Sequence, residues 1–113
     1  MSEDSLQSAC IKWFDYQYPK ISRLLHHSPN GGSRNILEAK KFKYMGVRAG
    51  FPDLILLIPR HGFASLCIEM KVGKNKQTQN QKQWQELAES ANNKYAVCRS
   101  FEEFVKIIND YLK

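Results

Sequence analysis

Apolar residues recur every three or four positions in four stretches of the chain, and this spacing is typical of amphipathic helices. The predicted helices cover residues 5–18, 34–45, 78–91 and the segment that follows Ser100. Asp4 or Ser5 can cap the first helix, and Pro19 closes it. Ser100 caps the last helix, and Glu103 stands at the third helical position, which predicts a capping box.

Shorter apolar runs predict β-strands over residues 21–26, 53–59, 63–72 and 95–98. The run from Asp53 to Pro59 is almost continuously apolar, which is typical of a buried strand. His61 and Gly62 form a turn between this run and the next, so the two strands are predicted to form a hairpin. The resulting order αβαββαβα predicts an α/β fold in which helices flank a mixed β-sheet.

The size and composition of the chain set its broad class. With 113 residues, the chain is predicted to form a single domain, 1–113. No stretch approaches the ~18 apolar residues of a membrane span, so no membrane association is expected. The N-terminus is acidic and lacks the apolar core of a secretory signal. Cys10, Cys67 and Cys98 lie within predicted helices and strands, which favours reduced thiols and a cytoplasmic location.

Three ionisable residues converge on the open end of the predicted hairpin. Asp53 begins the first strand, whereas Glu69 and Lys71 are two residues apart on the second and share a face. They can be ordinary strand-end charges, with Lys71 paired to a carboxylate. Asp and Glu are, however, depleted in strands, and buried charges are paired or bind metals. Two carboxylates and a backbone carbonyl suit a hard cation such as Mg²⁺, and a lysine beside it can act on a water.

The motif Pro52-Asp53 followed by Glu69-x-Lys71 resembles that of the PD-(D/E)xK, or restriction-endonuclease-like, nuclease superfamily. The chain is more closely similar to the VRR-NUC family, in the small stand-alone form found in phages and bacteria. The segments that carry the resemblance are His27-Ser-Pro-Asn-Gly-Gly32, Met45-Gly-Val-Arg-Ala-Gly-Phe-Pro-Asp53, Glu69-Met-Lys71, and Gln81 before Trp84. The resemblance implies a restriction-endonuclease-like core and a phosphodiesterase that uses Mg²⁺ or Mn²⁺ to cut DNA. It also implies a homodimer that cuts branched DNA, such as four-way (Holliday) junctions.

The resemblance also assigns roles to individual residues. Asp53 and Glu69 match the metal-binding carboxylates, and the backbone carbonyl of Met70 would be the third ligand. Lys71 matches the catalytic lysine, and Gln81 matches a glutamine that orients the lysine or the water. Glu3 matches a glutamate of the first helix that reaches the metal. The alternative for Glu3 is an acidic first-turn residue that favours the helix dipole.

Basic residues flank this candidate site in the sequence. Residues 20–48 contain seven Lys and Arg and one acidic residue, and residues 71–82 contain four Lys and no acidic residue. Phosphate contacts are therefore expected from several of these side chains and from the glycine-rich loop at 28–33. The candidates for nucleic-acid binding are Asn30, Gly31, Arg34, Lys40, Lys41, Lys43, Arg48, Lys74 and Lys76. The alternative for Lys40, Lys41 and Lys43 is a solvated helix face.

More aromatic residues occupy the first two predicted helices than one amphipathic face can bury. They are Trp13, Phe14, Tyr16, Tyr18, Phe42 and Tyr44. Either they complete the core of the protomer or some of them form a dimer interface. The leading hypothesis is a metal-dependent, structure-specific DNA endonuclease. The alternatives are a catalytically silent nucleic-acid-binding module, a flap or nicking nuclease, and an assembly subunit with an acidic protein partner.

Overall fold

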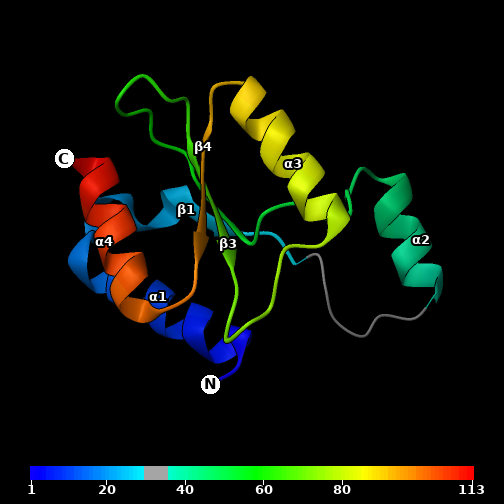
Figure 1. Ribbon diagram of the computed structural model, residues 1–113, viewed down its shortest axis with the longest axis horizontal. Helices are drawn as coiled ribbons and strands as arrows, with labels where there is room; N and C mark the ends of the chain where they lie inside the picture. Colours follow the sequence, from blue (N-terminus) through cyan, green and yellow to red (C-terminus); the bar gives the residue numbers. More distant parts are fainter. Residues whose placement is uncertain (30–35) are drawn as a thin grey trace.

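The computed structural model describes residues 1–29 and 36–113, which form a mixed sheet with helices on both faces (Figure 1). Its elements in chain order are α1 (Glu3–Gln17), the 3₁₀-helix η1 (Pro19–Leu24), β1 (Leu25–His27), α2 (Ile36–Tyr44), β2 (Leu54–Leu56), β3 (Leu66–Met70), α3 (Gln79–Ser90), β4 (Lys94–Cys98) and α4 (Phe101–Leu112). The predicted order αβαββαβα and the α/β class are confirmed.

The strands lie in the sheet in the order β1-β2-β3-β4. The first three are antiparallel neighbours, whereas β3 and β4 are parallel and are connected through α3. The segment between β2 and β3 reverses in a tight turn between the paired residues Arg60 and Phe63, with His61 and Gly62 both at positive φ (55° and 83°). Positive φ at both central residues suits a two-residue hairpin turn, because its twist matches that of the flanking strands.

Two helices cover one face of the sheet, and a third covers the other. The main core brings residues of α1 and α4, such as Phe14 and Phe104, against Leu54, Leu56 and Ile68 of the sheet. On the opposite face Ala88 of α3 packs against Cys67 and Tyr95, with Ile55 and Val97 beside them. In Figure 1 the helix α2 lies beyond α3, away from α1 and α4. No helix in the described part of the chain is long and apolar enough to cross a membrane.

The structure corrects the predicted boundaries near the N-terminus. Helix α1 begins earlier than predicted, because the hydroxyl of Ser2, rather than Asp4 or Ser5, accepts the cap hydrogen bond, from the Ser5 N–H. The predicted strand at 21–26 is mostly the 3₁₀-helix η1, and only Leu25–His27 joins the sheet. The fixed φ of Pro19 suits the first turn of a helix, which favours this local turn over extended chain.

Helix α3 starts with a capping box, and the cap predicted for α4 is present with one change. Thr78 and Gln81 form a complete capping box at α3. At α4 the Ser100 hydroxyl accepts from the Glu103 N–H as predicted, but the Glu103 carboxylate accepts from the Arg99 N–H. The Glu103 side chain therefore binds the backbone N–H of the residue before the cap, Arg99, and not that of Ser100 itself.

The aromatic residues of the first two helices divide between the core and the surface. Trp13, Phe14 and Tyr18 pack in the core of the protomer, whereas Tyr16 is exposed. No residue of α2 is buried, and its predicted apolar positions are solvent-exposed. The exposed apolar residues of this segment are Ile36, Leu37, Phe42, Tyr44 and Met45. Helix α2 ends at Tyr44, and Gly46 follows it with φ of +108°.

One glycine fixes the loop before β2 against the start of α3. Gly50 has φ of +83°, and a Cβ at this position would lie 2.6 Å from the carbonyl carbon of Asn80. A contact this short with backbone forces one segment to move. Gly62 has the same φ, but a Cβ there would meet nothing within 4 Å. The close approach at Gly50 also places Phe51 edge-on against Trp84 of α3 (ring centroids 5.0 Å apart).

We expect Gly50→Ala to destabilise the protein clearly more than Gly62→Ala. Both variants place a side chain at the same positive φ, which costs about 1 kcal/mol. Gly50→Ala adds the overpacking against Asn80, typically about 1–3 kcal/mol. Urea unfolding of the two variants measures the difference, and equal losses of stability would contradict the tight approach of this loop to α3.

Candidate active site

The hairpin register brings the two predicted carboxylates face to face. Leu54 pairs with Ile68 and Ile55 with Cys67, so one further residue along the strands places Asp53 opposite Glu69. Because side chains alternate along a strand, Asp53, Glu69 and Lys71 share the face that carries Cys67 and is covered by α3. The predicted convergence of the three groups is therefore present in the fold.

Asp53 is anchored to the strand that carries the other two groups. Its Oδ2 accepts a hydrogen bond from the Met70 N–H at 2.7 Å. The N–H and C=O of one strand residue point to the same side, so the Met70 carbonyl also faces the Asp53 edge. The Asp53 carbonyl in turn accepts hydrogen bonds from His27 Nδ1 at 2.8 Å and the Ser28 N–H at 3.2 Å. Both backbone and side chain of Asp53 are thus fixed by neighbouring strands.

Glu69 is 1% exposed, and each of its carboxylate oxygens accepts a hydrogen bond from a neutral donor. Gln81 Nε2 donates to Oε2 at 2.7 Å, and the Tyr95 hydroxyl donates to Oε1 at 3.1 Å. The orientation of the Gln81 amide is determined by the cap of α3, because its Oε1 accepts from the Thr78 N–H at 2.8 Å. A backbone N–H can only donate, so Nε2 must face Glu69. Gln81 therefore contacts the carboxylate directly.

The environment of Glu69 disfavours its charged form. Burial raises the pKa of this carboxyl most, followed by the charge of Asp53 and hydrogen bonding with it, and the pKa reaches about 8. The hydrogen bond from Tyr95 and the charge of Lys71 act in the opposite direction. A bound cation would favour the charged form of Glu69, because it would neutralise the two facing carboxylates.

Lys71 is 7% exposed, although it carries a charge. Within residues 1–29 and 36–113, the only ion pairs are those of Lys106 and Lys113 with Asp110. Lys71 therefore makes no direct ion pair with a described carboxylate. This argues against the alternative interpretation, in which Lys71 is only a salt-bridge partner. Its backbone N–H donates to the Cys98 carbonyl at 2.9 Å, which keeps it on the extension of β3.

The donor set of Asp53, Glu69 and the Met70 carbonyl fits an oxygen-liganded divalent cation. The described residues contain no cluster of three or more His, Cys, Asp or Glu able to hold a metal. Mg²⁺ usually binds through one or two carboxylates and keeps several waters, so a pair of carboxylates is sufficient for it. The Glu3 carboxylate accepts a hydrogen bond from Asn75 Nδ2, in the loop between β3 and α3, at 3.3 Å. The structure does not group Glu3 with Asp53 and Glu69.

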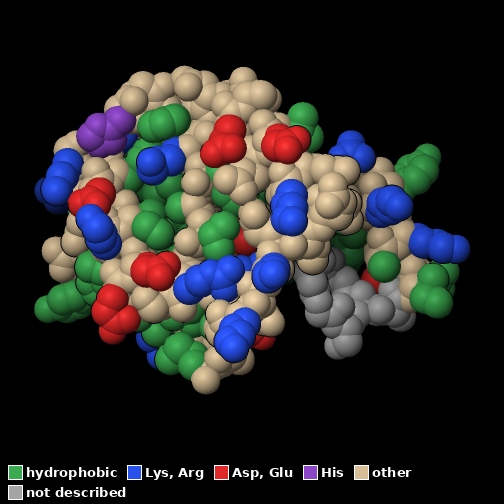
Figure 2. Space-filling model, in the orientation of Figure 1, with side chains coloured by type: hydrophobic (Ala, Val, Ile, Leu, Met, Phe, Trp, Pro, Cys, Tyr) green, Lys and Arg blue, Asp and Glu red, His purple; other side chains and the backbone are tan. Residues whose placement is uncertain are grey.

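The candidate DNA-binding residues fall into three groups. Lys74 and Lys76 are exposed in the loop between β3 and α3, directly after Lys71. A second group, of exposed basic residues, lies on α2 and just after it: Lys40, Lys41, Lys43 and Arg48. The third group comprises Asn30, Gly31 and Arg34, which lie outside the described residues. Figure 2 shows Lys and Arg side chains gathered below the centre of the view, where the β3–α3 loop lies in Figure 1.

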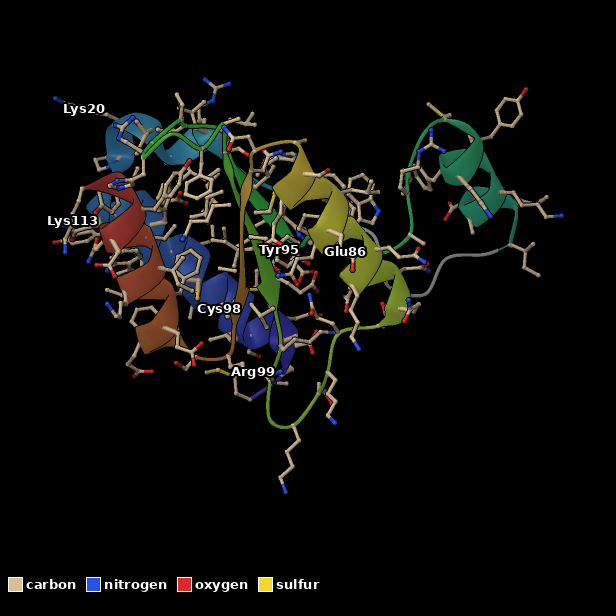
Figure 3. All side chains as sticks on the ribbon, turned by 45° about the horizontal axis from the view of Figure 1, so that its top comes forward. Lys20, Glu86, Tyr95, Cys98, Arg99 and Lys113 are labelled. Carbon is tan, nitrogen blue, oxygen red and sulfur yellow. The ribbon has the colours of Figure 1, made fainter. Side chains whose placement is uncertain are left out.

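Two residues at the site were not predicted from the sequence. Tyr95 reaches Glu69 because β4 is parallel to β3, with Tyr95 in register with Cys67. Arg99 follows β4, and its Nη1 donates to the Gly73 carbonyl at 3.2 Å, which adds a cation to the β3–α3 loop. Figure 3 shows Tyr95 between the sheet and α3, and Arg99 at the end of β4. In the sequence, Arg99 adjoins an acidic C-terminal stretch. Only the fold shows that it lies beside the β3–α3 loop.

Comparisons with known proteins identify the family and support the fold. The family model described as the VRR-NUC domain matches residues 1–102. A solved structure titled "VRR_NUC domain protein" is 33% identical and superposes with a TM-score of 0.86. The alignment covers 99% of this chain and 88% of that one. Among curated proteins, none matches the chain.

We expect Glu69→Gln to stabilise the metal-free protein at alkaline pH. The folded-state pKa of about 8 exceeds the ordinary value of 4.5, so folded protein retains a proton that unfolded protein loses between these values. The contribution of Glu69 to stability therefore falls as the pH rises through this window. In EDTA, the variant should have a higher Tm than the wild type at about pH 8.5 and a similar Tm at about pH 5.

The matched control for this measurement is Glu86→Gln, which neutralises an exposed glutamate on α3. It should not raise the Tm selectively at alkaline pH. A Glu69→Gln protein whose Tm follows the wild type at every pH would show that the site does not disfavour the charged form of Glu69.

Proposed function

The chain belongs to the VRR-NUC family of nucleases, and from this premise we propose that it is a metal-dependent endodeoxyribonuclease that hydrolyses phosphodiester bonds at the Asp53–Glu69–Lys71 site. The observation that carries the proposal is the arrangement of two facing carboxylates and a buried lysine on one face of β2 and β3. A protein that only bound DNA would have no need of these three groups in one place.

Each residue of the site has a distinct role in the proposed hydrolysis of the phosphodiester bond. Asp53, Glu69 and the Met70 carbonyl would hold Mg²⁺ or Mn²⁺, which supplies a Lewis acid for the scissile phosphate. Lys71 is adjacent in sequence and faces the same side, so its ammonium group is placed to act on the attacking water and on the charge developing at phosphorus. Gln81 keeps Glu69 in orientation through the hydrogen bond at 2.7 Å.

The surface next to the site supports binding through the DNA backbone. Lys74 and Lys76 lie in the loop that follows Lys71, Arg99 contacts this loop, and α2 presents further lysines. Exposed Lys and Arg side chains bind phosphates without reading sequence. We therefore assign DNA as the substrate, recognised by its backbone and shape.

We further propose that the substrate is branched DNA, such as a four-way junction, and that the protein cuts it as a homodimer. Resolution of a junction needs two symmetric cuts, which a two-fold dimer with one site in each protomer provides. The support for an interface is the exposed apolar surface of the α2 segment, where Ile36 and Leu37 are 73% and 79% exposed. Scattered surface apolar residues are common, but several in one segment mark contact surfaces.

We expect the wild type, in Mg²⁺, to cut a four-way junction at paired symmetric positions, and Asp53→Asn and Lys71→Met to lose this cleavage. Removing one charge that acts in the transition state costs about 10²–10³-fold in rate or more. A panel of single-stranded, duplex, flap and four-way-junction DNA, with and without Mg²⁺, measures both the activity and the preferred structure.

Lys94→Met serves as the control, because Lys94 is an exposed lysine on β4 whose ammonium lies over the Phe63 ring, at 5.3 Å. It should cut at the wild-type rate. DNA binding without cleavage of any substrate would overturn the proposed enzymatic activity and identify the protein as a DNA-binding module. Single, uncoordinated nicks from a protein that is monomeric by light scattering would instead identify a flap or nicking nuclease.

We expect the double charge reversal Lys74→Glu/Lys76→Glu to weaken DNA binding and to flatten its salt dependence. Each lost phosphate contact lowers the log–log salt slope by about 0.9 on duplex DNA, so two contacts lower it by about 1.8. Fluorescence anisotropy in Ca²⁺ at several salt concentrations measures the slope. Lys20→Glu/Lys113→Glu makes the same change in net charge, and Figure 3 shows both residues far from Arg99. Equal log–log salt slopes in the two double variants would place the DNA on another surface.

A further inference from the structure

Tyr95 is a buried tyrosine whose hydroxyl reaches the candidate metal site from β4. Its side chain packs with Cys67 and Ala88 between the sheet and α3 (Figure 3). Because β3 and β4 are parallel, Tyr95 is in register with Cys67, and Val97 is the residue in register with Glu69. The phenol spans this offset of two residues, and its hydroxyl meets Glu69 Oε1 at 3.1 Å.

The two donors to Glu69 come from different elements. Gln81 approaches Oε2 from the first turn of α3, where the capping box fixes its amide. Tyr95 approaches Oε1 from β4, where the ring is held by packing. A glutamate side chain has three rotatable bonds, and one donor alone leaves the carboxylate free to turn about the remaining contact. Donors at both oxygens fix the plane of the carboxylate.

We propose that Tyr95 is a positioning residue for the metal site, one that orients the Glu69 carboxylate so that its remaining lone pairs face the Asp53 side chain and the Met70 carbonyl. This inference rests on the proposed function, since it assigns Tyr95 a role toward the cation that Asp53 and Glu69 would hold. Hydrogen-bond partners that orient metal ligands typically contribute 10–100-fold to metal affinity. Tyr95 is therefore expected to act through Glu69 without touching the metal or the DNA.

The competing explanation is that Tyr95 only satisfies a buried polar group and stabilises the fold. The chain offers a direct comparison in Tyr111, another buried tyrosine. The Tyr111 hydroxyl donates to the Ile58 carbonyl at 2.7 Å on the opposite face of the sheet, in the core formed with α1 and α4. Removing either hydroxyl deletes one buried hydrogen bond, but only Tyr95 contacts a candidate metal ligand.

The test compares Tyr95→Phe with Tyr111→Phe by Mn²⁺ binding in the absence of DNA, measured as free Mn²⁺ by electron paramagnetic resonance. We expect Tyr95→Phe to weaken Mn²⁺ binding about tenfold. Tyr111→Phe should bind Mn²⁺ as the wild type does, even where its thermal stability falls by a similar amount. In cleavage assays, raised Mg²⁺ should restore the activity of Tyr95→Phe, because the metal ligands and Lys71 are all retained.

Unchanged Mn²⁺ affinity in Tyr95→Phe would overturn the positioning role while leaving the proposed nuclease intact. A wild type that binds no Mn²⁺ and cuts no DNA would overturn the metal site and, with it, the role of Tyr95. If Tyr95→Phe fails to fold, the ultraviolet difference spectrum of the wild type on Mg²⁺ addition tests whether a tyrosine responds to the metal. A tyrosine signal that persists in Tyr111→Phe supports the contact with the ligand, and no signal overturns it.

Discussion

The pairing of β2 with β3 is the constraint on which the candidate site depends. This hairpin register sets Asp53 opposite Glu69 and turns Glu69 and Lys71 toward α3. The bond from the Met70 N–H to Asp53 Oδ2 extends the pairing to the residue just before β2, with a side chain in place of a backbone acceptor. A slip of one residue would turn the side chains of one strand to the opposite face and separate the three groups. The apolar residues on the other face, such as Leu54 and Ile68, oppose such a slip because it would bring them out of the main core.

The sequence contained enough information to predict the charged residues of the site but not their partners. Asp53, Glu69 and Lys71 were predictable because strand periodicity and a tight turn determine which side chains meet across a hairpin. Tyr95 was not, because its contact with Glu69 depends on the parallel register of β3 and β4, which a crossover through α3 establishes. The position of Arg99 was also not predictable, because its hydrogen-bond partner Gly73 lies 26 residues away along the chain.

The elements show a similar division between local and tertiary information. Ser100 was recognisable as a capping residue because a helix start is decided within four residues. The segment before β1 was predicted wrongly as a strand, since its apolar residues fit either structure and Pro19 favoured a 3₁₀ turn. Periodicity also predicted the helix α2 correctly, yet it did not reveal that the apolar side of α2 is exposed in the protomer. Whether an apolar stripe faces a core is a property of the tertiary arrangement.

The capping box of α3 has a consequence for how this protein can change. Glutamate is as good a choice as glutamine at the third position of a capping box, and its charge also favours the helix dipole. Position 81 is different, because the same side chain that accepts from Thr78 also donates to Glu69. A glutamate there would cap the helix but would add a third carboxylate beside two that already repel each other, and it would have no N–H to donate. Evolution or design for a more stable helix at this position therefore conflicts with retention of the site.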